Sequence, residues 1–275
     1  MQWIQIWFRP LFLFIGLGFF AEGFCIEKGP RIASASPATT EFLYYFNLEK
    51  LLVGRTQFDE YPKEVKDIPI IGSPYNFDFE KALKSKVQLV IGPRTSLVQF
   101  KTKLKQLNIE YFELSARNFE DYLDSLKKLL SRLSLSREKS FKQLKARVKR
   151  VVGPWNKKKS IYLHSLSRDI RGQLKGAYVA TTESLYGDLL NHFSLFNPVV
   201  QKHSESVYID REGLIKIKPE IIIYNQKTDL NDVLSEVYKD KIFINLKESS
   251  FEIPGPRFFE IFPSLEKKLR NAFSQ

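Results

Sequence analysis

Cysteine and histidine are scarce in this chain of 275 residues, and their scarcity limits the chemistry that it can hold. Cys25 is the only cysteine, so no disulfide can form within the chain. The three histidines, His164, His192 and His203, are too scattered for the ligand spacing of a zinc site. We therefore expect neither a structural zinc site nor a metal site made of histidines alone.

The sequence also lacks the motifs of common catalytic and nucleotide-binding sites. It contains no GxSxG, no Walker phosphate loop, no GxGxxG and no HExxH. An enzyme needs an activated nucleophile or base, and only the neighbourhood of His164 and Asp169 offers material for acid–base chemistry. We expect that the chain is not an enzyme, with an exported α/β hydrolase or chelatase as the alternative.

Long apolar runs are absent beyond the N-terminus. Leu11–Ala21 has eleven residues, fewer than the roughly 20 that a helix needs to cross a bilayer. This run and the small-x-small sequence Ala21-Glu22-Gly23 are typical of a secretory signal. We predict a signal peptide at 1–23 and a periplasmic or otherwise extracytoplasmic location. A retained anchor and a lipid on Cys25 are the alternatives, although the residues before Cys25 fit lipidation poorly.

Positive charge predominates, with 43 Lys and Arg against 31 Asp and Glu and a net charge of +12. An excess of positive charge can favour binding to nucleic acid or to an anionic membrane. The basic residues are spread along the chain, with local density at Lys142–Arg150 and Lys157–Lys159. We predict a solvated basic surface and no nucleic-acid partner. The alternative is a surface protein whose basic middle helices bind anionic lipid or polymer.

Short apolar runs alternate with amphipathic stretches beyond Pro30, which predicts βαβ units and a parallel sheet. Nearly continuous runs such as Leu89–Ile91 suit strands that are buried on both faces. The expected strands are Arg31–Ala35, Leu51–Gly54, Pro69–Ile71, Gln88–Ile91, Ile109–Leu114, Ser160–Leu163, Ala177–Ala180, Glu220–Tyr224 and Lys241–Leu246. The helices expected among the first five strands are Glu41–Phe46, Glu80–Lys84 and Leu97–Leu107.

The middle of the chain is polar and rich in lysine, without a strand-like run. Asn118–Leu133 and Ser136–Val152 have the pattern of helices, and Gly153-Pro154 ends the second. A final helix is expected at Phe258–Phe273. We predict an α/β protein with two Rossmann-like lobes, one long connecting helix and a ligand cleft between the lobes. The predicted divisions are an N-terminal lobe at 30–117, a helical connector at 118–157 with its main helix at 136–152, and a C-terminal lobe at 158–275.

An internal repeat supports two similar lobes. Residues 77–91, FDFEKALKSKVQLVI, align without a gap on residues 209–223, IDREGLIKIKPEIII. A second likeness, Ala38–Tyr44 with Ala180–Tyr186, precedes each copy in the same order. Chance similarity between short helix-strand units is the alternative, but the order and the shared polar residues favour a duplication. The shared polar residues are Asp78 with Asp210, Glu80 with Glu212, Lys84 with Lys216 and Lys86 with Lys218.

Glu80 and Glu212 are singled out by the repeat. A carboxylate near a helix start is favoured by about 0.3–1 kcal/mol, and this effect alone could account for both. In two similar lobes side by side, they would also form a matched pair for two basic sites on a two-fold partner. Each exposed ion pair contributes about 0–1 kcal/mol, and two engaged together gain from effective concentration.

A cleft between two lobes is a common ligand site, and in open α/β sheets it lies beyond the carboxyl ends of the strands. The loops expected there carry aromatic, hydroxyl and arginine side chains, which suit a large, partly flat organic ligand with acidic groups. Taken singly, each is as well explained as an ordinary loop residue. The candidate ligand-binding residues are Ser36, Phe58, Tyr61, Tyr75, Arg94, His164, Arg168, Thr181 and Thr182.

Four segments resemble the cobalamin and iron-siderophore class of periplasmic binding proteins: RIASASPATTE at 31–41, GRTQFDEYP at 54–62, FDFEKALKSKVQLVIG at 77–92 and IPGPRFF at 253–259. The resemblance implies two lobes joined by one rigid helix, and a glutamate on each lobe that docks on arginines of a membrane permease. Glu80 and Glu212 occupy the matching positions. It further implies a monomeric substrate-binding protein of an ABC importer, peripheral to the membrane. Such a protein captures cobalamin or a ferric siderophore and delivers it to the transmembrane subunits.

Departures from the family pattern leave the chelate open. Haem-binding relatives often place a tyrosine directly after the glycine that matches Gly72, where this chain has Ser73 and, later, Tyr75. Cobalamin-binding relatives have an aromatic residue near the turn before the first docking glutamate. The matching position here is Pro74 or Tyr75. A haem-binding protein of the same fold therefore remains an alternative. No protein-held cofactor or metal is expected apart from the captured chelate.

Overall fold

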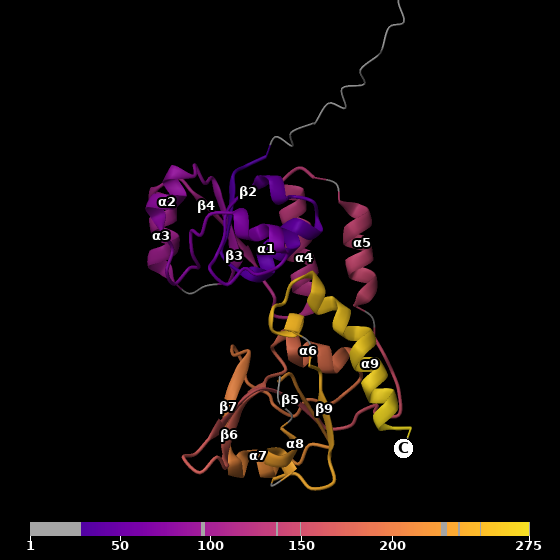
Figure 1. Cartoon of the computed structure of the whole chain (residues 1–275). Helices are drawn as coiled ribbons and strands as arrows, with labels where there is room; N and C mark the ends of the chain where they lie inside the picture. The colour runs from indigo at the N-terminus through magenta and orange to yellow at the C-terminus, as the bar shows by residue number, and fades with distance from the viewer. Residues whose placement is uncertain are drawn as a thin grey trace, which may run out of the picture.

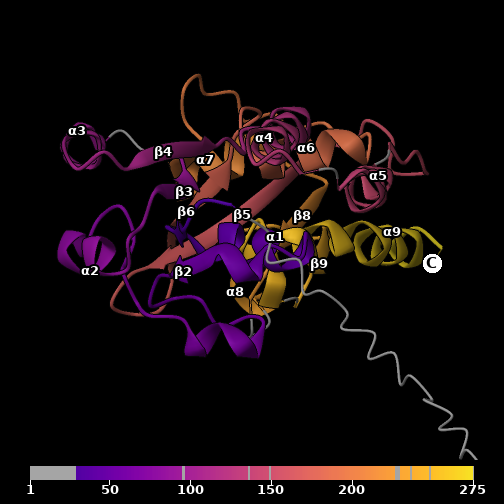
Figure 2. The ribbon, with the colours of Figure 1, turned by 90° about the horizontal axis from the view of Figure 1, so that it is seen from above.

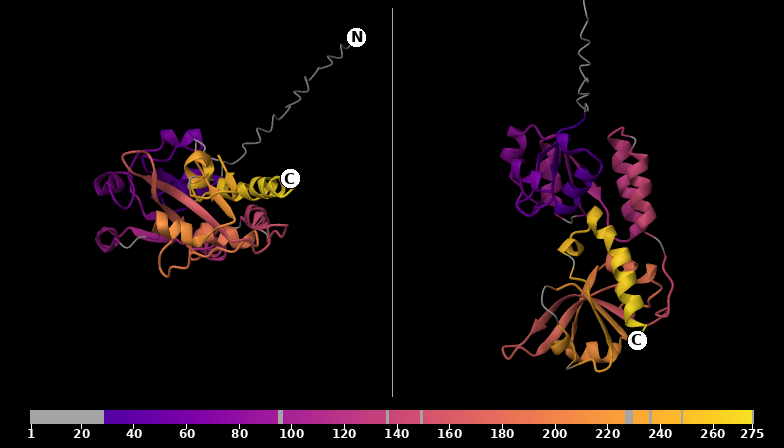
Figure 3. Two further views of the ribbon diagram at one scale, coloured as in Figure 1. Left: turned by 90° about the horizontal axis from the view of Figure 1, so that it is seen from below. Right: turned by 45° about the vertical axis from the view of Figure 1, so that its right-hand side comes forward.

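Two lobes, one above the other, form the structure (Figure 1). The computed structural model describes residues 29–94, 97–135, 137–148, 150–226, 230–235, 237–247 and 249–274. The predicted signal peptide at 1–23 and Cys25 lie outside the described residues. Two helices lie along one side of the molecule where the lobes meet. α5 (Glu138–Arg147) is above and α9 (Ile261–Ala272) is below (Figure 3).

The N-terminal lobe contains a parallel four-stranded sheet in the order β2-β1-β3-β4. The predicted strand at Pro69–Ile71 is wrong, because only an isolated bridge joins Ile70 to Arg55, and Pro69 has no N–H to donate to a ladder. The strands are β1 (Ile32–Ser34), β2 (Leu52–Gly54), β3 (Leu89–Pro93) and β4 (Glu110–Leu114). The helices are α1 (Pro37–Tyr45), η1 (Glu49–Leu51), η2 (Lys63–Asp67), α2 (Phe79–Lys84) and α3 (Val98–Gln106).

The C-terminal lobe contains a mixed five-stranded sheet in the order β7-β6-β5-β8-β9. β5, β8 and β9 are parallel, whereas β6 and β7 pair antiparallel, and β7 is a strand that the sequence analysis missed. The strands are β5 (Ser160–Arg168), β6 (Leu174–Ala180), β7 (Ser206–Asp210), β8 (Ile221–Tyr224) and β9 (Ile242–Asn245). The remaining elements are α6 (Leu185–His192), α7 (Arg211–Ile217), α8 (Asn231–Ser235), η3 (Ser249–Glu252) and η4 (Pro256–Glu260).

The connector consists of two helices, α4 (Phe119–Arg132) and α5. The helix predicted at 136–152 is shorter in the structure, since α5 ends at Arg147. Beyond it, the Val151 N–H donates to the His192 carbonyl at 2.7 Å, and the buried Trp155 donates its indole N–H to the Phe193 carbonyl at 2.8 Å. Docking these side chains into the C-terminal lobe takes this stretch out of the helix.

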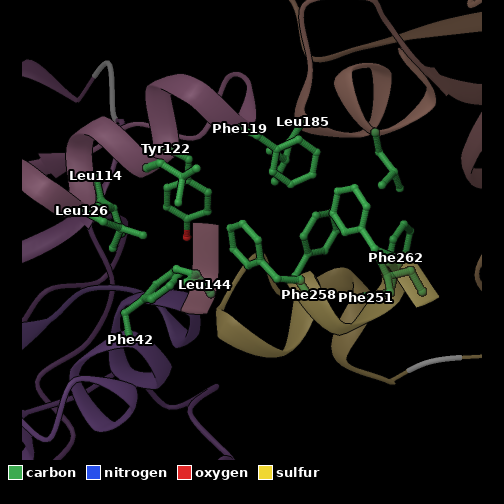
Figure 4. Packing of buried hydrophobic residues seen from close by; sticks show 14 of the residues in the cluster. Phe42, Leu114, Phe119, Tyr122, Leu126, Leu144, Leu185, Phe251, Phe258 and Phe262 are labelled. Atoms are coloured by element: carbon green, nitrogen blue, oxygen red, sulfur yellow. The ribbon is translucent and has the colours of Figure 1, made fainter. Parts of the chain in front are cut away.

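Three hydrophobic clusters stabilise the fold. One lies within the N-terminal lobe around Val90 and Phe100, and another within the C-terminal lobe around Ile222 and Leu214. The third is shared: it includes Ile91 of the first sheet and residues of the second sheet, and its centre is aromatic (Figure 4). The aromatic residues at this centre are Phe42 of α1, Phe119 and Tyr122 of α4, and Phe251, Phe258, Phe259 and Phe262 near the C-terminus.

Residues 251–262, here called the crossing segment, join the lobes. The segment follows β9 of the C-terminal lobe, packs on α1 and α4, and continues into α9. The Tyr122 hydroxyl donates to the Pro254 carbonyl, and the Tyr186 hydroxyl donates to the Phe251 carbonyl at 3.0 Å. The segment is therefore bonded to α4 in the connector and to α6 in the C-terminal lobe.

A buried ion pair fixes the crossing segment to α1. The Glu41 side chain is 2% exposed, and the Arg257 guanidinium donates to both of its carboxylate oxygens, with Nε at 3.1 Å from Oε2. The guanidinium also lies 4.0 Å from the centre of the Tyr61 ring. A side-chain carbon at Gly255 would stand 2.6 Å from a Glu41 carboxylate oxygen, so only glycine permits this approach.

Arg257→Met is expected to lower the free energy of unfolding by about 3–5 kcal/mol, because it leaves the Glu41 carboxylate buried without a partner. Urea unfolding followed by tryptophan fluorescence measures the loss. Lys142→Met is the control, since its ion pair with Glu138 is exposed and contributes less than about 1 kcal/mol. Equal losses in the two variants would contradict the role given to the buried pair.

Candidate functional site: the interlobe cavity and two surface glutamates

The repeat predicted from the sequence is also a repeat of backbone conformation. Asp78 caps α2 and accepts from the Lys81 N–H at 2.9 Å, while Asp210 caps α7 and accepts from the Gly213 N–H at 2.8 Å. The aligned residues Lys86 and Lys218 are both left-handed, with φ of 51° and 49°. Each copy then leads into a buried strand, β3 or β8. The hydrogen bond from Lys81 lowers the pKa of Asp78.

Glu80 and Glu212 stand in the first turns of these matching helices, one in each lobe. Both side chains are exposed. Within the described part of the chain, neither carboxylate has an ion pair or side-chain hydrogen bond. Seen from the front and from above, α2 lies on the side of its lobe away from α5 and α9 (Figures 1 and 2). Both carboxylates are thus available to a partner, and docking stays a prediction.

The second likeness predicted from the sequence is wrong as a structural repeat. Thr39–Glu41 lies inside α1, whereas Thr181–Glu183 precedes α6. The two glutamates also differ in role: Glu41 is buried against Arg257, while Glu183 is exposed and accepts from the His203 N–H at 3.0 Å. The similar residues therefore occupy different places relative to the helix in the two lobes.

A cavity of about 350 Å³ lies between the N-terminal lobe and the crossing segment. It is found where the chain leaves β1, β3 and β4, at the carboxyl ends of parallel strands, as expected for an α/β sheet. The N-terminus of α1 and Phe58 form part of one wall, and the crossing segment forms another. The lining residues are Ser36, Pro37, Ala38, Thr39, Phe58, Pro93, Leu114, Ala116, Tyr122, Glu252, Ile253 and Pro254.

Of the predicted ligand-binding residues, Ser36 and Phe58 line this cavity. The Ser36 hydroxyl caps α1 by accepting from the Thr39 N–H at 3.3 Å. The Phe58 side chain is 61% exposed. Tyr61 instead lines a separate hollow beside Arg257. The structure therefore does not bring Tyr61 into the interlobe cavity.

Two further candidates of the N-terminal lobe lie on its surface. Tyr75 is 83% exposed, on a turn where Asn76 accepts from the Ser73 N–H at 3.0 Å. Arg94 is exposed after β3, with its Nε 4.0 Å from Glu113. Neither contributes to the lining of the cavity, so any contact with a ligand would occur outside it.

His164 lies just after the parallel part of β5, edge-on to two tyrosine rings that stack on each other. The ring centres of Tyr162 and Tyr186 are 5.0 and 4.7 Å from that of His164. Its Nε2 is buried and has no hydrogen-bond partner among the described residues. Burial lowers the pKa of His164 to about 4, because the charged imidazolium would lose its hydration.

The other candidates of the C-terminal lobe differ in exposure. Arg168, at the end of β5, and Thr182 are exposed. Thr181 is fully buried, and its hydroxyl donates to the Ser204 carbonyl. Its side chain therefore holds the lobe together instead of facing a ligand.

Sequence reasoning missed Tyr122 and Glu252 as cavity residues. Tyr122 comes from the connector and Glu252 from the crossing segment; the segment IPGPRFF directly follows Glu252, whereas no motif marked Tyr122. In the described ranges, no group of three or more His, Cys, Asp or Glu side chains is placed to hold a metal ion. No helix in those ranges is long and apolar enough to span a membrane.

Residues 32–247 match the sequence profile of the periplasmic binding protein family. The chain is 25% identical over 213 residues to an uncharacterised ABC transporter substrate-binding lipoprotein of Bacillus subtilis, covering 72% of this chain and 64% of the relative. It is 27% identical over 119 residues to a vitamin B12-binding protein of Vibrio cholerae, covering 43% and 42%. The alignments thus span less than two thirds of these relatives.

Solved structures confirm the two-lobed α/β fold. A periplasmic vitamin B12-binding protein of Vibrio cholerae is similar with a TM-score of 0.70 at 15% identity, over 90% of this chain and 99% of that one. A periplasmic haem-binding protein of the same species gives 0.68 at 17% identity, over 87% and 98%. These relatives are all binding proteins by name, which agrees with the prediction that the chain is not an enzyme.

His164 and His192 are expected to titrate far apart. His164 should lose its proton near pH 4. Burial opposes the charge on His192 as well, but the hydrogen bonds and charge of Asp188 outweigh it and raise the pKa above 6.5. NMR titration of the ring C–H signals measures both. A His164 signal that titrates near 6.5 would contradict the burial of this ring.

The same burial makes stability depend on pH. The unfolded chain protonates His164 near 6.5, whereas the folded chain does so only near 4, so this residue removes stability as the pH falls between these values. His164→Phe should remove this part of the loss, and a comparison of the two urea-unfolding midpoints between pH 7 and 4.5 measures it.

Proposed function

Because the chain belongs to the periplasmic binding protein family, we propose that it is the extracytoplasmic substrate-binding protein of an ABC importer. It captures a metal chelate between its lobes and delivers it to a membrane permease. The observation that carries this proposal is the interlobe cavity, which opens beyond the carboxyl ends of β1, β3 and β4 and is lined on another side by the crossing segment. Its volume, about 350 Å³, lies within the usual range of small-molecule sites.

The proposed cargo is cobalamin or a ferric siderophore. Phe58 and Tyr122 give the cavity aromatic walls, and Ser36 with the N-terminus of α1 gives it polar groups, which together suit one part of a large organic ligand that extends beyond the cavity. Similarity to a vitamin B12-binding protein supports this class. The second candidate is haem, whose iron a phenolate can ligate; the exposed Tyr75 is the candidate ligand, although Ser73 and not a tyrosine directly follows Gly72.

Capture needs little movement of the lobes. The shared aromatic cluster and the buried Glu41–Arg257 pair hold them together, and a close-packed interior resists gradual deformation. We propose that the protein works outside the cytoplasm as a monomer, peripheral to the membrane. The exposed and unpaired Glu80 and Glu212 are proposed to dock on basic residues of the permease, one from each lobe.

The purified protein is expected to bind cyanocobalamin or a ferric siderophore one to one, seen in its absorbance spectrum after desalting. Phe58→Ala should weaken that binding at least fivefold, because an aromatic contact contributes about 1 kcal/mol or more. Phe196→Ala is the control: Phe196 is 54% exposed but pairs with Lys159, directly before the start of β5, whereas the cavity lies at the carboxyl ends of strands. Retention of haem alone would select the second candidate.

The double variant Glu80→Lys and Glu212→Lys is expected to keep its affinity for the ligand and to lower transport at least tenfold in proteoliposomes with the permease. Each single variant should have a smaller effect, because the two contacts act together. Glu120→Lys is the matched control, since Glu120 is an exposed glutamate in the first turn of α4. Loss of ligand affinity in the double variant would rule out a docking role.

A further inference from the structure

Asp59 is a buried acid next to the cavity, on the loop that follows β2. It is 3% exposed, and its carboxylate accepts hydrogen bonds from the hydroxyls of Thr40 and Thr56 and from the Thr56 N–H at 3.4 Å. Both threonines are fully buried. A buried carboxylate needs hydrogen-bond donors or a paired cation, so these bonds connect the loop firmly to α1, which carries Thr40.

The same bonds continue to Phe58. The Thr56 hydroxyl donates its proton to Asp59, and its oxygen accepts the Phe58 N–H at 3.1 Å. The Phe58 side chain is 61% exposed and lines the cavity. Because little packs around the ring, its position depends mainly on the backbone of Phe58. That backbone bonds directly to the Thr56 hydroxyl and, through this hydroxyl, to Asp59.

The opposite end of this network lies in the helix that forms the neighbouring wall. Thr40 belongs to α1, and the first turn of α1 lines the cavity together with Phe58. Asp59 therefore fixes the distance between the aromatic wall on the loop and the polar wall on the helix. A ligand group that fits between these walls requires that their spacing be fixed before it binds.

We propose that Asp59 is a positioning residue for ligand capture, which holds Phe58 at a fixed place against the α1 wall without touching the ligand itself. This inference rests on the function proposed above. Arg55 supports the arrangement: it is 8% exposed, and its guanidinium donates to the carbonyls of Ile68 and Thr56, both at 2.9 Å. The loop is thereby tied at its start as well as at Asp59.

Acid is expected to loosen this arrangement. Burial raises the pKa of Asp59, against the opposing effects of the hydrogen bonds from Thr40 and Thr56 and of the charge on Arg55. A protonated Asp59 is a weaker acceptor for the two threonine hydroxyls. Ligand affinity should therefore fall as the pH drops through the pKa of Asp59, and this dependence should be absent in Asp59→Asn.

A double-mutant cycle separates positioning from simple stabilisation. Its probes are cyanocobalamin, a ferric trihydroxamate and hemin, each titrated by tryptophan quenching at pH 7. Asp59→Asn is expected to weaken the binding of the retained probe about fivefold, no more than removal of the Phe58 ring, but less than twofold when Phe58 is already alanine. Thr40→Val, which removes one donor and keeps the carboxylate, should behave in the same way and serves if Asp59→Asn does not fold. Equal losses in both Phe58 backgrounds, or no loss, would overturn the proposal.

A ligand-free measurement keeps this test independent of the proposed function. 4-Fluorophenylalanine at position 58 reports the mobility of the ring through its ¹⁹F relaxation. Asp59→Asn or Thr40→Val is expected to shift the ¹⁹F signal and make the ring more mobile, while Phe196→Ala leaves both unchanged. If no probe binds the wild-type protein, the proposed function fails and the ¹⁹F result still decides the role of Asp59. An unchanged ¹⁹F signal in both variants would refute that role.

Discussion

The pairing of Glu41 with Arg257 determines where the last part of the chain lies, and both lobes depend on that part. Arg257 brings the crossing segment onto α1, and the aromatic side chains around it then fill the space between the lobes. A buried charge pair of this kind adds little net stability compared with an apolar pair, yet it is costly to break. Its main effect is to fix one register of the segment on α1.

The cavity is a consequence of that register. Ile253 and Pro254 reach the N-terminal lobe only because the residues after them are held on α1, and Tyr122 bonds the same stretch to α4. A contact outside the segment also joins the connector to the C-terminal lobe: the Phe119 N–H at the start of α4 donates to Asp188 of α6 at 2.9 Å. The site is thus assembled by tertiary contacts, with the loop of Phe58 as its most local part.

Local rules predicted much of the fold. The repeated unit was predicted correctly because an N-cap aspartate, a short helix and a buried apolar strand are each encoded within about fifteen residues. β7 escaped prediction because none of its residues is buried and its apolar run, Val207–Ile209, is only three residues long. The end of the helix predicted at 136–152 was wrong because the C-terminal lobe takes up Val151 and Trp155, a tertiary effect that overrides helix periodicity.

The site was harder to predict than the fold. Ser36 and Phe58 were recognised because they lie in the loops that follow β1 and β2, where position in the sheet implies position in the cleft. Tyr122 and Glu252 reach the cavity through contacts between segments far apart in sequence, which no local pattern encodes. Asp59 was missed for another reason: its role depends on burial and on two threonine partners, and a single acidic letter in a loop reveals neither.

The shared aromatic cluster also constrains how such a protein can evolve. On one face, each sheet packs in a hydrophobic cluster of its own lobe. The other faces share one cluster, to which the crossing segment and α4 contribute side chains. Although the lobes carry copies of one unit, neither is a self-sufficient module. An exchange of one lobe between relatives would preserve a closed interior only if residues 251–262 were inherited together with their contacts on α1.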